Sequence, residues 1–331
     1  MPDTQTQTET QRPAFDGADL VVSTDDLTKT FADETAVDHI NLKIPRGVIF
    51  GFIGPSGCGK TTTVRMLLGI YNPSSGSARV LDSDPQTFSR NEQEKIGYMP
   101  QRFVLNPELS VMENLNFAAS LYGVPWRRKK RLSALLELVA LDGHEHKKVA
   151  NISGGMRRRL SMITALAHEP ELIFLDEPTA GIDPVLRRTF WDYFIDLKDQ
   201  NRTLFVTTQY VGEAAYCDYV GVMLKGRLLA VDTPTRLRRS AIGGDIIRLE
   251  TETFMPPGML ERLETQTAVS IVRVSRQKDN ILHIIVDDAS ANMAPLLEWV
   301  KEQGITVKTI NEYVPPFDDV FVKLVEKADS Q

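Results

Sequence analysis

The feature that most constrains the fold is a glycine-rich segment that directly follows an almost wholly apolar run. The run is Val48–Ile53, and the segment after it reads Gly54-Pro55-Ser56-Gly57-Cys58-Gly59-Lys60-Thr61. Such a run is typical of a strand buried on both faces of a parallel sheet, and the residues after Lys60 have the spacing of a helix. A strand, a loop and a helix in this order begin an α/β unit. The sequence therefore predicts an α/β fold.

The glycine-rich segment fits the pattern GxxxxGK[ST] of phosphate-binding loops. Glycines let backbone N–H groups curl around phosphate oxygens at a helix N-terminus, where the partial positive charge favours an anion. Lys60 supplies a positive charge between the outer phosphates, and the Thr61 hydroxyl suits Mg²⁺. Cys58 is interpreted as a small filler rather than a nucleophile. We expect a nucleoside triphosphate site here, with an incidental glycine-rich turn as the alternative.

A second apolar strand ends in two carboxylates. Leu172–Leu175 is followed by Asp176 and Glu177, and a third apolar run, Thr203–Thr208, also precedes polar residues. A parallel sheet places its functional loops at the C-terminal ends of its strands. Next to a phosphate-binding loop, Asp176 is suited to hold Mg²⁺ and Glu177 to polarise a water for attack on the γ-phosphate. A helix cap or a surface acid pair is the alternative.

Composition and charge exclude several classes of protein. The 331 residues are 42% hydrophobic with a net charge of −6, so wholesale disorder and a globally basic nucleic-acid binder are disfavoured. The two cysteines, Cys58 and Cys217, are far apart, which indicates a reducing compartment. No apolar stretch is long enough to span a bilayer, and no signal peptide is recognisable. We expect a soluble cytosolic chain with a disordered tail over residues 1–18.

Further motifs resemble those of one superfamily, the ATP-binding cassette (ABC) ATPases of membrane transporters. Ile152-Ser153-Gly154-Gly155-Met156 resembles the LSGGQ signature, and Ala180-Gly181-Ile182-Asp183 resembles the D-loop. Gln101 resembles the Q-loop glutamine, and Phe31 resembles the aromatic residue that stacks on adenine. The motifs occur in family order over residues 19–240. A plain core position remains the alternative for Phe31.

The resemblance implies a set of site residues. It implies that the nucleotide contacts Phe31 and the loop residues Gly54, Pro55, Ser56, Gly57, Cys58, Gly59, Lys60, Thr61 and Thr62. It implies Mg²⁺ held by Thr61, Gln101 and Asp176, and a catalytic set of Gln101, Glu177 and Gln209. It further implies that Ser153, Gly154 and Gly155 complete the ATP site of a second cassette in a head-to-tail pair, and it assigns Asp183 to the D-loop.

The chain departs from the common family pattern at the switch position. Most members have His after the strand that corresponds to Thr203–Thr208, whereas this chain has Gln209, as does the branch resembling daunorubicin-resistance ATPases. A glutamine amide can donate a hydrogen bond to a γ-phosphate oxygen but cannot take up a proton at neutral pH. We therefore expect Gln209 to position the phosphate while Glu177 orients the water. Slow hydrolysis at this site is the alternative.

The C-terminal third has a different pattern. From about residue 245 the apolar spacing alternates as β-α-β-β-α-β, the order of a ferredoxin-like module, with a turn at 277–280. The segment 315–327 is predicted to be an amphipathic helix, and its Asp318–Val322 resembles the end of many ABC-2 exporter cassettes. We therefore expect a P-loop NTPase of the ABC type over 19–240, with an inserted helical subdomain at about 102–165, and an α+β accessory module over 245–327.

The resemblance implies the ATPase subunit of an ABC-type exporter at the cytoplasmic face of the cell membrane. Its implied partners are ATP, a second cassette in a homodimer or heterodimer, and a separately encoded permease; no nucleic-acid partner is expected. Two other functions stay open, a soluble cassette ATPase that acts on nucleic acid or ribosomes, and a nucleotide-dependent regulatory module without turnover. The sequence does not identify the cargo, and export over import is implied by the branch resemblance alone.

Overall fold

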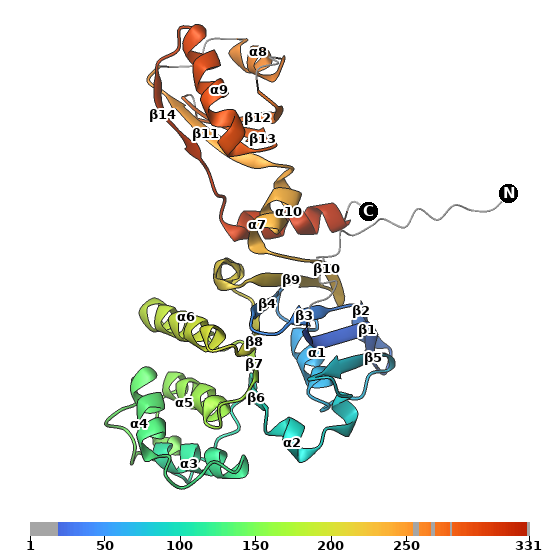
Figure 1. Cartoon of the computed structure of the whole chain (residues 1–331), viewed down its shortest axis with the longest axis vertical. Helices are drawn as coiled ribbons and strands as arrows, with labels where there is room; N and C mark the ends of the chain where they lie inside the picture. Colours follow the sequence, from blue (N-terminus) through green and yellow to red (C-terminus); the bar gives the residue numbers. More distant parts are fainter. Residues whose placement is uncertain (1–18, 254–257, 266–268, 279, 330–331) are drawn as a thin grey trace, which may run out of the picture. The chain divides into compact units, whose positions relative to one another are not determined.

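The computed structural model describes residues 19–253, 258–265, 269–278 and 280–329, so the expected tail over 1–18 lies outside the described residues. Contacts within the chain divide it into two units, with the boundary between Thr233 and Pro234. The sequence analysis ends the cassette at residue 240. The structure instead assigns helix α7 (Pro234–Ile242) to the C-terminal unit, because α7 packs on α10 (Phe317–Asp329). Figure 1 shows the elements of both units.

A six-stranded sheet forms the centre of the N-terminal unit. Its order is β10-β9-β4-β8-β7-β6, and neighbours are parallel except β10, which is antiparallel to β9. Every residue of β4, β7 and β8 is buried, as expected for apolar runs covered on both faces. Their C-terminal ends therefore meet at one sheet edge. The strands span Ile49–Ile53 (β4), Ile96–Met99 (β6), Leu172–Asp176 (β7), Thr203–Thr208 (β8), Tyr219–Leu224 (β9) and Arg227–Asp232 (β10).

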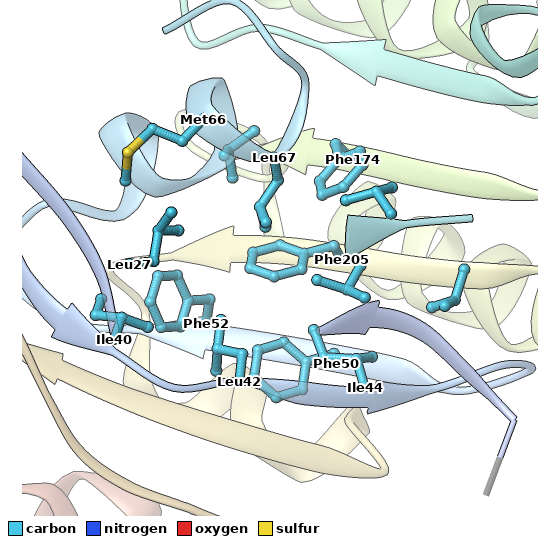
Figure 2. Close-up of a cluster of buried hydrophobic side chains, with 14 of the residues drawn as sticks. Leu27, Ile40, Leu42, Ile44, Phe50, Phe52, Met66, Leu67, Phe174 and Phe205 are labelled. Atoms are coloured by element: carbon cyan, nitrogen blue, oxygen red, sulfur yellow. The ribbon is translucent and has the colours of Figure 1, made fainter. Parts of the chain in front are cut away.

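A four-stranded antiparallel sheet shares its core with the parallel sheet. In it, β1 (Leu20–Phe31) pairs with β2 (Glu34–Ile40), β3 (Lys43–Pro45) and β5 (Ser75–Val80). Figure 2 shows the aromatic side chains of the parallel sheet against aliphatic side chains of the antiparallel sheet and of α1. Phe205 lies at the centre, with its ring centroid 5.2 Å from that of Phe50, 5.5 Å from Phe52 and 5.4 Å from Phe174.

Three helices of this unit, α3 (Val111–Leu121), α5 (Gly154–Leu166) and α6 (Pro184–Asp199), begin after a residue whose side chain accepts a hydrogen bond from the first turn. α3 begins after Ser110, which exchanges side-chain and backbone hydrogen bonds with Glu113 in a capping box. α4 (Lys129–Leu138) ends shortly before Ala140, which adopts a φ of 50°. The remaining segments are α1 (Lys60–Leu67), α2 (Arg90–Gln93) and the 3₁₀ turns η1 (Pro85–Thr87), η2 (Val149–Asn151) and η3 (Val211–Tyr216).

α3, α4 and α5 contact one another and form a helical cluster within the N-terminal unit (Figure 1). Within the ranges that the structure describes, no helix of either unit has both the length and the apolar character needed to cross a membrane.

The C-terminal unit contains a separate antiparallel sheet of order β12-β13-β11-β14. One face packs with two helices around a core that includes Leu249, Ile284 and Leu296. The expected turn at 277–280 includes Asp279, which lies outside the described residues. The terminal helix α10 begins at Phe317, directly after two prolines. The other elements are β11 (Asp245–Thr251), α8 (Met259–Thr265), β12 (Ile271–Lys278), β13 (Ile281–Val286), α9 (Ala289–Glu302) and β14 (Val307–Glu312).

Phe205→Ala should lower the free energy of unfolding by about 3–5 kcal/mol, because it leaves a cavity among three aromatic rings. Equilibrium urea denaturation of the full chain, followed by tryptophan fluorescence, measures this change. Phe117→Ala is the matched control, since the side chain on α3 is 55% exposed and its removal should change the free energy by less than about 0.5 kcal/mol. Equal losses in the two variants would contradict the central position of Phe205.

Candidate nucleotide-binding site

The loop between β4 and α1 depends on close backbone approaches that only glycine allows. The Gly54 N–H donates to Thr208 O at 3.4 Å, which joins the start of the loop to the end of β8. A Cβ on Gly54 would lie 2.2 Å from Met223 O, and a Cβ on Gly59 would lie 2.4 Å from Ala36 O. Gly59 also has a φ of +112°, which side chains other than glycine rarely adopt. Glycine is therefore required at both positions.

The side chain of Lys60 is folded into this loop. It is 5% exposed, and its Nζ donates to the carbonyl oxygens of Gly54 at 2.7 Å and Pro55 at 3.0 Å. These bonds satisfy a buried ammonium group and hold its charge at the N-terminus of α1, where an anion is favoured. Burial raises the pKa of the neighbouring Cys58 thiol, which therefore stays protonated at neutral pH.

Asp176 connects three segments of the N-terminal unit. It is the last residue of β7, and its side chain is fully buried. Thr61 Oγ1 of α1 donates to its carboxylate at 3.1 and 2.9 Å, and Thr207 Oγ1 of β8 donates at 2.6 Å. The Thr61 hydroxyl and the Asp176 carboxylate are hard oxygen ligands in direct contact. This pair therefore fits a magnesium ion, which prefers such oxygen ligands.

Glu177 extends the same site from an unusual backbone conformation. Its φ is 54°, in the left-handed region, where a residue with a side chain is strained by about 1–3 kcal/mol. Several contacts hold it there. Its N–H donates to Thr207 Oγ1 at 3.1 Å, its carbonyl accepts from Arg158, and Gln101 Nε2 donates to its Oε2 at 3.3 Å. Gln101 and Glu177 are thus brought together, as the sequence analysis expects for a shared site.

The remaining expected site residues lie apart from this cluster or make different contacts. Ser153 caps α5 by accepting from Met156 N at 3.2 Å, and Gly154 and Gly155 after it are exposed. Asp183 caps α6 by accepting from Leu186 N at 3.0 Å. Among the residues described, none of these four makes a hydrogen bond to the phosphate-binding loop of its own chain.

Two other expected residues are exposed on the N-terminal unit. Phe31 is 42% exposed at the end of β1 and packs edge-on against Tyr71, with ring centroids 5.5 Å apart. Gln209 follows β8 directly and is exposed. The exposure of Phe31 does not fit the alternative of a plain core residue.

Thr207 and Arg158 make hydrogen bonds to Asp176 or Glu177 that the sequence does not predict. Thr207 ends a run of residues with strand propensity, so its role in contacting both carboxylate residues is not visible in the pattern. Arg158 lies in a run of three arginines on α5, and its guanidinium also faces the Phe103 ring at 5.6 Å. Burial lowers the pKa of Arg158. A polar residue at the C-terminal end of a buried strand is the one signal that could have identified Thr207.

Residues 37–180 match the sequence profile of the ABC transporter family. The chain is 38% identical over 221 residues to a probable multidrug ABC transporter ATP-binding protein of Escherichia coli, YbhF, and the alignment covers 66% of this chain but only 38% of that protein. It is 32% identical over 306 residues to the daunorubicin/doxorubicin resistance ATP-binding protein DrrA of Streptomyces peucetius, with 92% of each chain covered. It is 35% identical to a Nod factor export ATP-binding protein of Cupriavidus pinatubonensis, covering 74% of this chain and 76% of the relative.

Solved structures share this fold. The chain resembles an ATP binding subunit of an ABC transporter with a TM-score of 0.62 and 25% identity, over 66% of this chain and 92% of that one. It also resembles cbiO1 of Clostridium perfringens, described as part of an ABC transporter complex, with a TM-score of 0.57 and 27% identity, over 66% and 90% of the two chains.

Thr207→Val should lower the free energy of unfolding by about 1–3 kcal/mol, because it removes the hydroxyl shared by Asp176 and the Glu177 N–H and leaves buried polar groups without that partner. Urea denaturation of the full chain measures the loss. Thr35→Val is the control, since Thr35 is an exposed strand residue whose hydroxyl contact water can replace. If both variants were as stable as the parent, the bridging role of Thr207 would be wrong.

Proposed function

Because the chain belongs to the ABC transporter family, we propose that it is the ATP-binding and ATP-hydrolysing subunit of a membrane exporter. The observation that carries the proposal is the contact between Thr61 and Asp176 beside Glu177. A phosphate-binding loop, oxygen ligands for Mg²⁺ and a carboxylate for water meet there at one sheet edge. Relatives named for multidrug transport, Nod factor export and drug resistance support export as the direction of transport.

We propose that ATP binds along the loop, with its phosphates on the backbone N–H groups between Gly54 and Thr62. Lys60, which donates to two loop carbonyls in the described structure, turns toward the outer phosphate oxygens when the nucleotide is present. Phe31 stacks on adenine, and its exposure supports this role because an aromatic face must be accessible for stacking.

Bound Mg²⁺ would neutralise phosphate charge and orient the γ-phosphate. Thr61 and Asp176 would supply two oxygen ligands, and Gln101 a third through its amide oxygen. The contact of Gln101 Nε2 with Glu177, at 3.3 Å, supports this assignment because it places the amide beside the residue that directly follows Asp176.

Glu177 is the residue that we assign to the attacking water. Its carboxylate polarises the water as a general base, while the Gln101 amide holds one of its oxygens. Gln209 donates a hydrogen bond from its amide to a γ-phosphate oxygen, and its exposed position at the end of β8 supports this role. Water activation and phosphate positioning are thereby divided between two side chains.

A second cassette completes each ATP site in this proposal. Ser153, Gly154 and Gly155 begin α5, and their exposed backbone offers N–H groups to the γ-phosphate of a nucleotide held by the other chain. Shifting the pair from 1:99 to 99:1 closed requires about 5.5 kcal/mol of differential binding. Several charge-assisted hydrogen bonds at two sites, each about 1.5–3 kcal/mol, are sufficient. Hydrolysis removes the bridging phosphate, so the pair reopens.

The permease would dock on an exposed apolar surface of the helical cluster. Phe117 and Leu121 lie four residues apart on α3, so they share one face, and they are 55% and 58% exposed. Val104 and Trp126 are 83% and 92% exposed in the segments before and after α3. Such a group of exposed apolar side chains is typical of an interaction site. Docking there would place the chain at the cytoplasmic face of the membrane as a peripheral subunit.

We also propose that the C-terminal unit is a ferredoxin-like accessory module. The order β11, α8, β12, β13, α9, β14 and the sheet order β12-β13-β11-β14 support this assignment, because each helix connects two strands that are separated by one antiparallel strand.

Glu177→Gln should retain ATP binding, abolish turnover and trap an ATP-dependent dimer, because the amide cannot polarise the water but leaves the phosphate contacts intact. Phosphate release and size-exclusion chromatography with ATP and Mg²⁺ measure the two effects. Glu171→Gln is the control, since Glu171 is an exposed residue before β7 and should keep parental turnover. Normal turnover of Glu177→Gln would refute the assignment of the water to Glu177.

Gln209→Ala should lower kcat by about tenfold or more, because it removes a hydrogen bond to the γ-phosphate that strengthens in the transition state. Gln209→His should retain turnover, since imidazole can also donate this bond. It should also introduce a pH dependence near pH 6.5 that the parent lacks. Steady-state ATPase assays over pH 5.5–8.5 test both variants. Unchanged kcat in Gln209→Ala would show that Gln209 has no such role.

A further inference from the structure

Two short segments of the N-terminal unit correspond to the expected D-loop and to the position of Gln209. The D-loop, residues 180–183, precedes α6, and the exposed Gln209 precedes η3. α6 and η3 pack side by side, since the Trp191 and Tyr216 rings stack with centroids 5.1 Å apart and an interplanar angle of 13°. This stacking joins α6 to η3, so a displacement of the D-loop and α6 is passed to η3 and the segment before it.

Arg187 on α6 contacts both segments with one guanidinium group. Its Nη2 donates to Ile182 O in the D-loop at 3.2 Å. Its guanidinium carbon lies 4.5 Å from the centroid of the Tyr210 ring, directly after Gln209. Its Nε lies 3.8 Å from Glu213 Oε1 on η3. A planar guanidinium can make these contacts at once, whereas the point charge of a lysine ammonium cannot.

The Glu213 side chain is buried and the Arg187 side chain is partly buried, and the pair is incompletely hydrogen-bonded. Glu213 is 4% exposed, and within the described ranges neither of its carboxylate oxygens makes a hydrogen bond, nor does Arg187 Nε. Their separation of 3.8 Å is an ion pair beyond hydrogen-bond reach. Buried groups of this kind gain a charge-assisted hydrogen bond if they approach. A small shift of α6 toward η3 is therefore favourable at this point.

We propose that Arg187 is a positioning residue that couples the D-loop to Gln209. When the second cassette contacts the D-loop, Arg187 transmits the displacement through Tyr210 and Glu213, and Gln209 takes its place against the γ-phosphate of its own chain. The inference rests on the proposed function, because it requires two cassettes and ATP hydrolysis. In this proposal Arg187 acts through Tyr210 and Glu213 and is assigned no contact with the nucleotide or with the attacking water.

Arg187→Met should lower kcat for ATP by about fivefold or more, while the Kd for ATP stays within about twofold. Arg187→Lys should restore part of kcat, since it keeps the charge beside Glu213 but loses the planar contact with Tyr210. Steady-state ATPase assays of the full chain and fluorescent ATP-analogue titrations measure the two quantities. Arg188→Met is the matched control, an exposed arginine on the same helix that should keep the parental kcat.

Several results would decide against the coupling. Equal kcat values of Arg187→Met and Arg188→Met in an active parent would overturn the inference and leave the proposed function intact. A parallel loss of ATP affinity and kcat would also overturn it, since a merely structural role has that effect. A parent chain that binds ATP without hydrolysing it would overturn the proposed function and the coupling together. If Arg187→Met does not fold, Tyr210→Leu removes the ring and should give the same fall in kcat at unchanged Kd.

Discussion

The buried carboxylate of Asp176 is the interaction on which the rest of the site depends. A charge fully removed from water is costly unless hydrogen bonds compensate it, and here two threonine hydroxyls donate to it, Thr61 from α1 and Thr207 from β8. The same bonds hold the start of α1 beside the ends of two parallel strands. The glycine-rich loop, which leads into α1, is therefore positioned by the residue that we also propose as a magnesium ligand. The Asp176 side chain therefore supports the loop in addition to its proposed role as a ligand of Mg²⁺.

The two sheets of the N-terminal unit supply the rigidity that this arrangement needs. Phe205 of β8 packs on the rings of Phe50 and Phe52 in β4 and of Phe174 in β7. This close packing restrains β4, β7 and β8 relative to one another. Glu177, at the end of these strands, has a strained left-handed backbone conformation. Its N–H donates to Thr207 and its carbonyl accepts from Arg158, and both bonds stabilise that conformation. Such support suits the role that we propose for Glu177, because the carboxylate of a general base must be placed to within a fraction of an ångström.

Much of the fold could be predicted from the sequence, because apolar runs such as Val48–Ile53 and Thr203–Thr208 are long enough to indicate buried strands. The proximity of Thr61 and Asp176 follows from the rule that parallel strands share one functional edge. Other features have no local signal. The left-handed conformation of Glu177 and its contact with Arg158 depend on tertiary packing between α5 and β7. The unit boundary before Pro234 differs from the expected end of the cassette at residue 240, because the amphipathic pattern of α7 does not reveal which partner its apolar face will cover.

The presence of two separate hydrophobic cores has a consequence for how such a chain can diverge. Among the described residues, the core beneath the nucleotide site and the core around Leu249 and Leu296 share no side chain. Substitutions that accumulate in one core need no compensation in the other. Natural selection can therefore reshape the C-terminal unit for new tasks while the ancestral ATPase machinery is inherited almost unaltered.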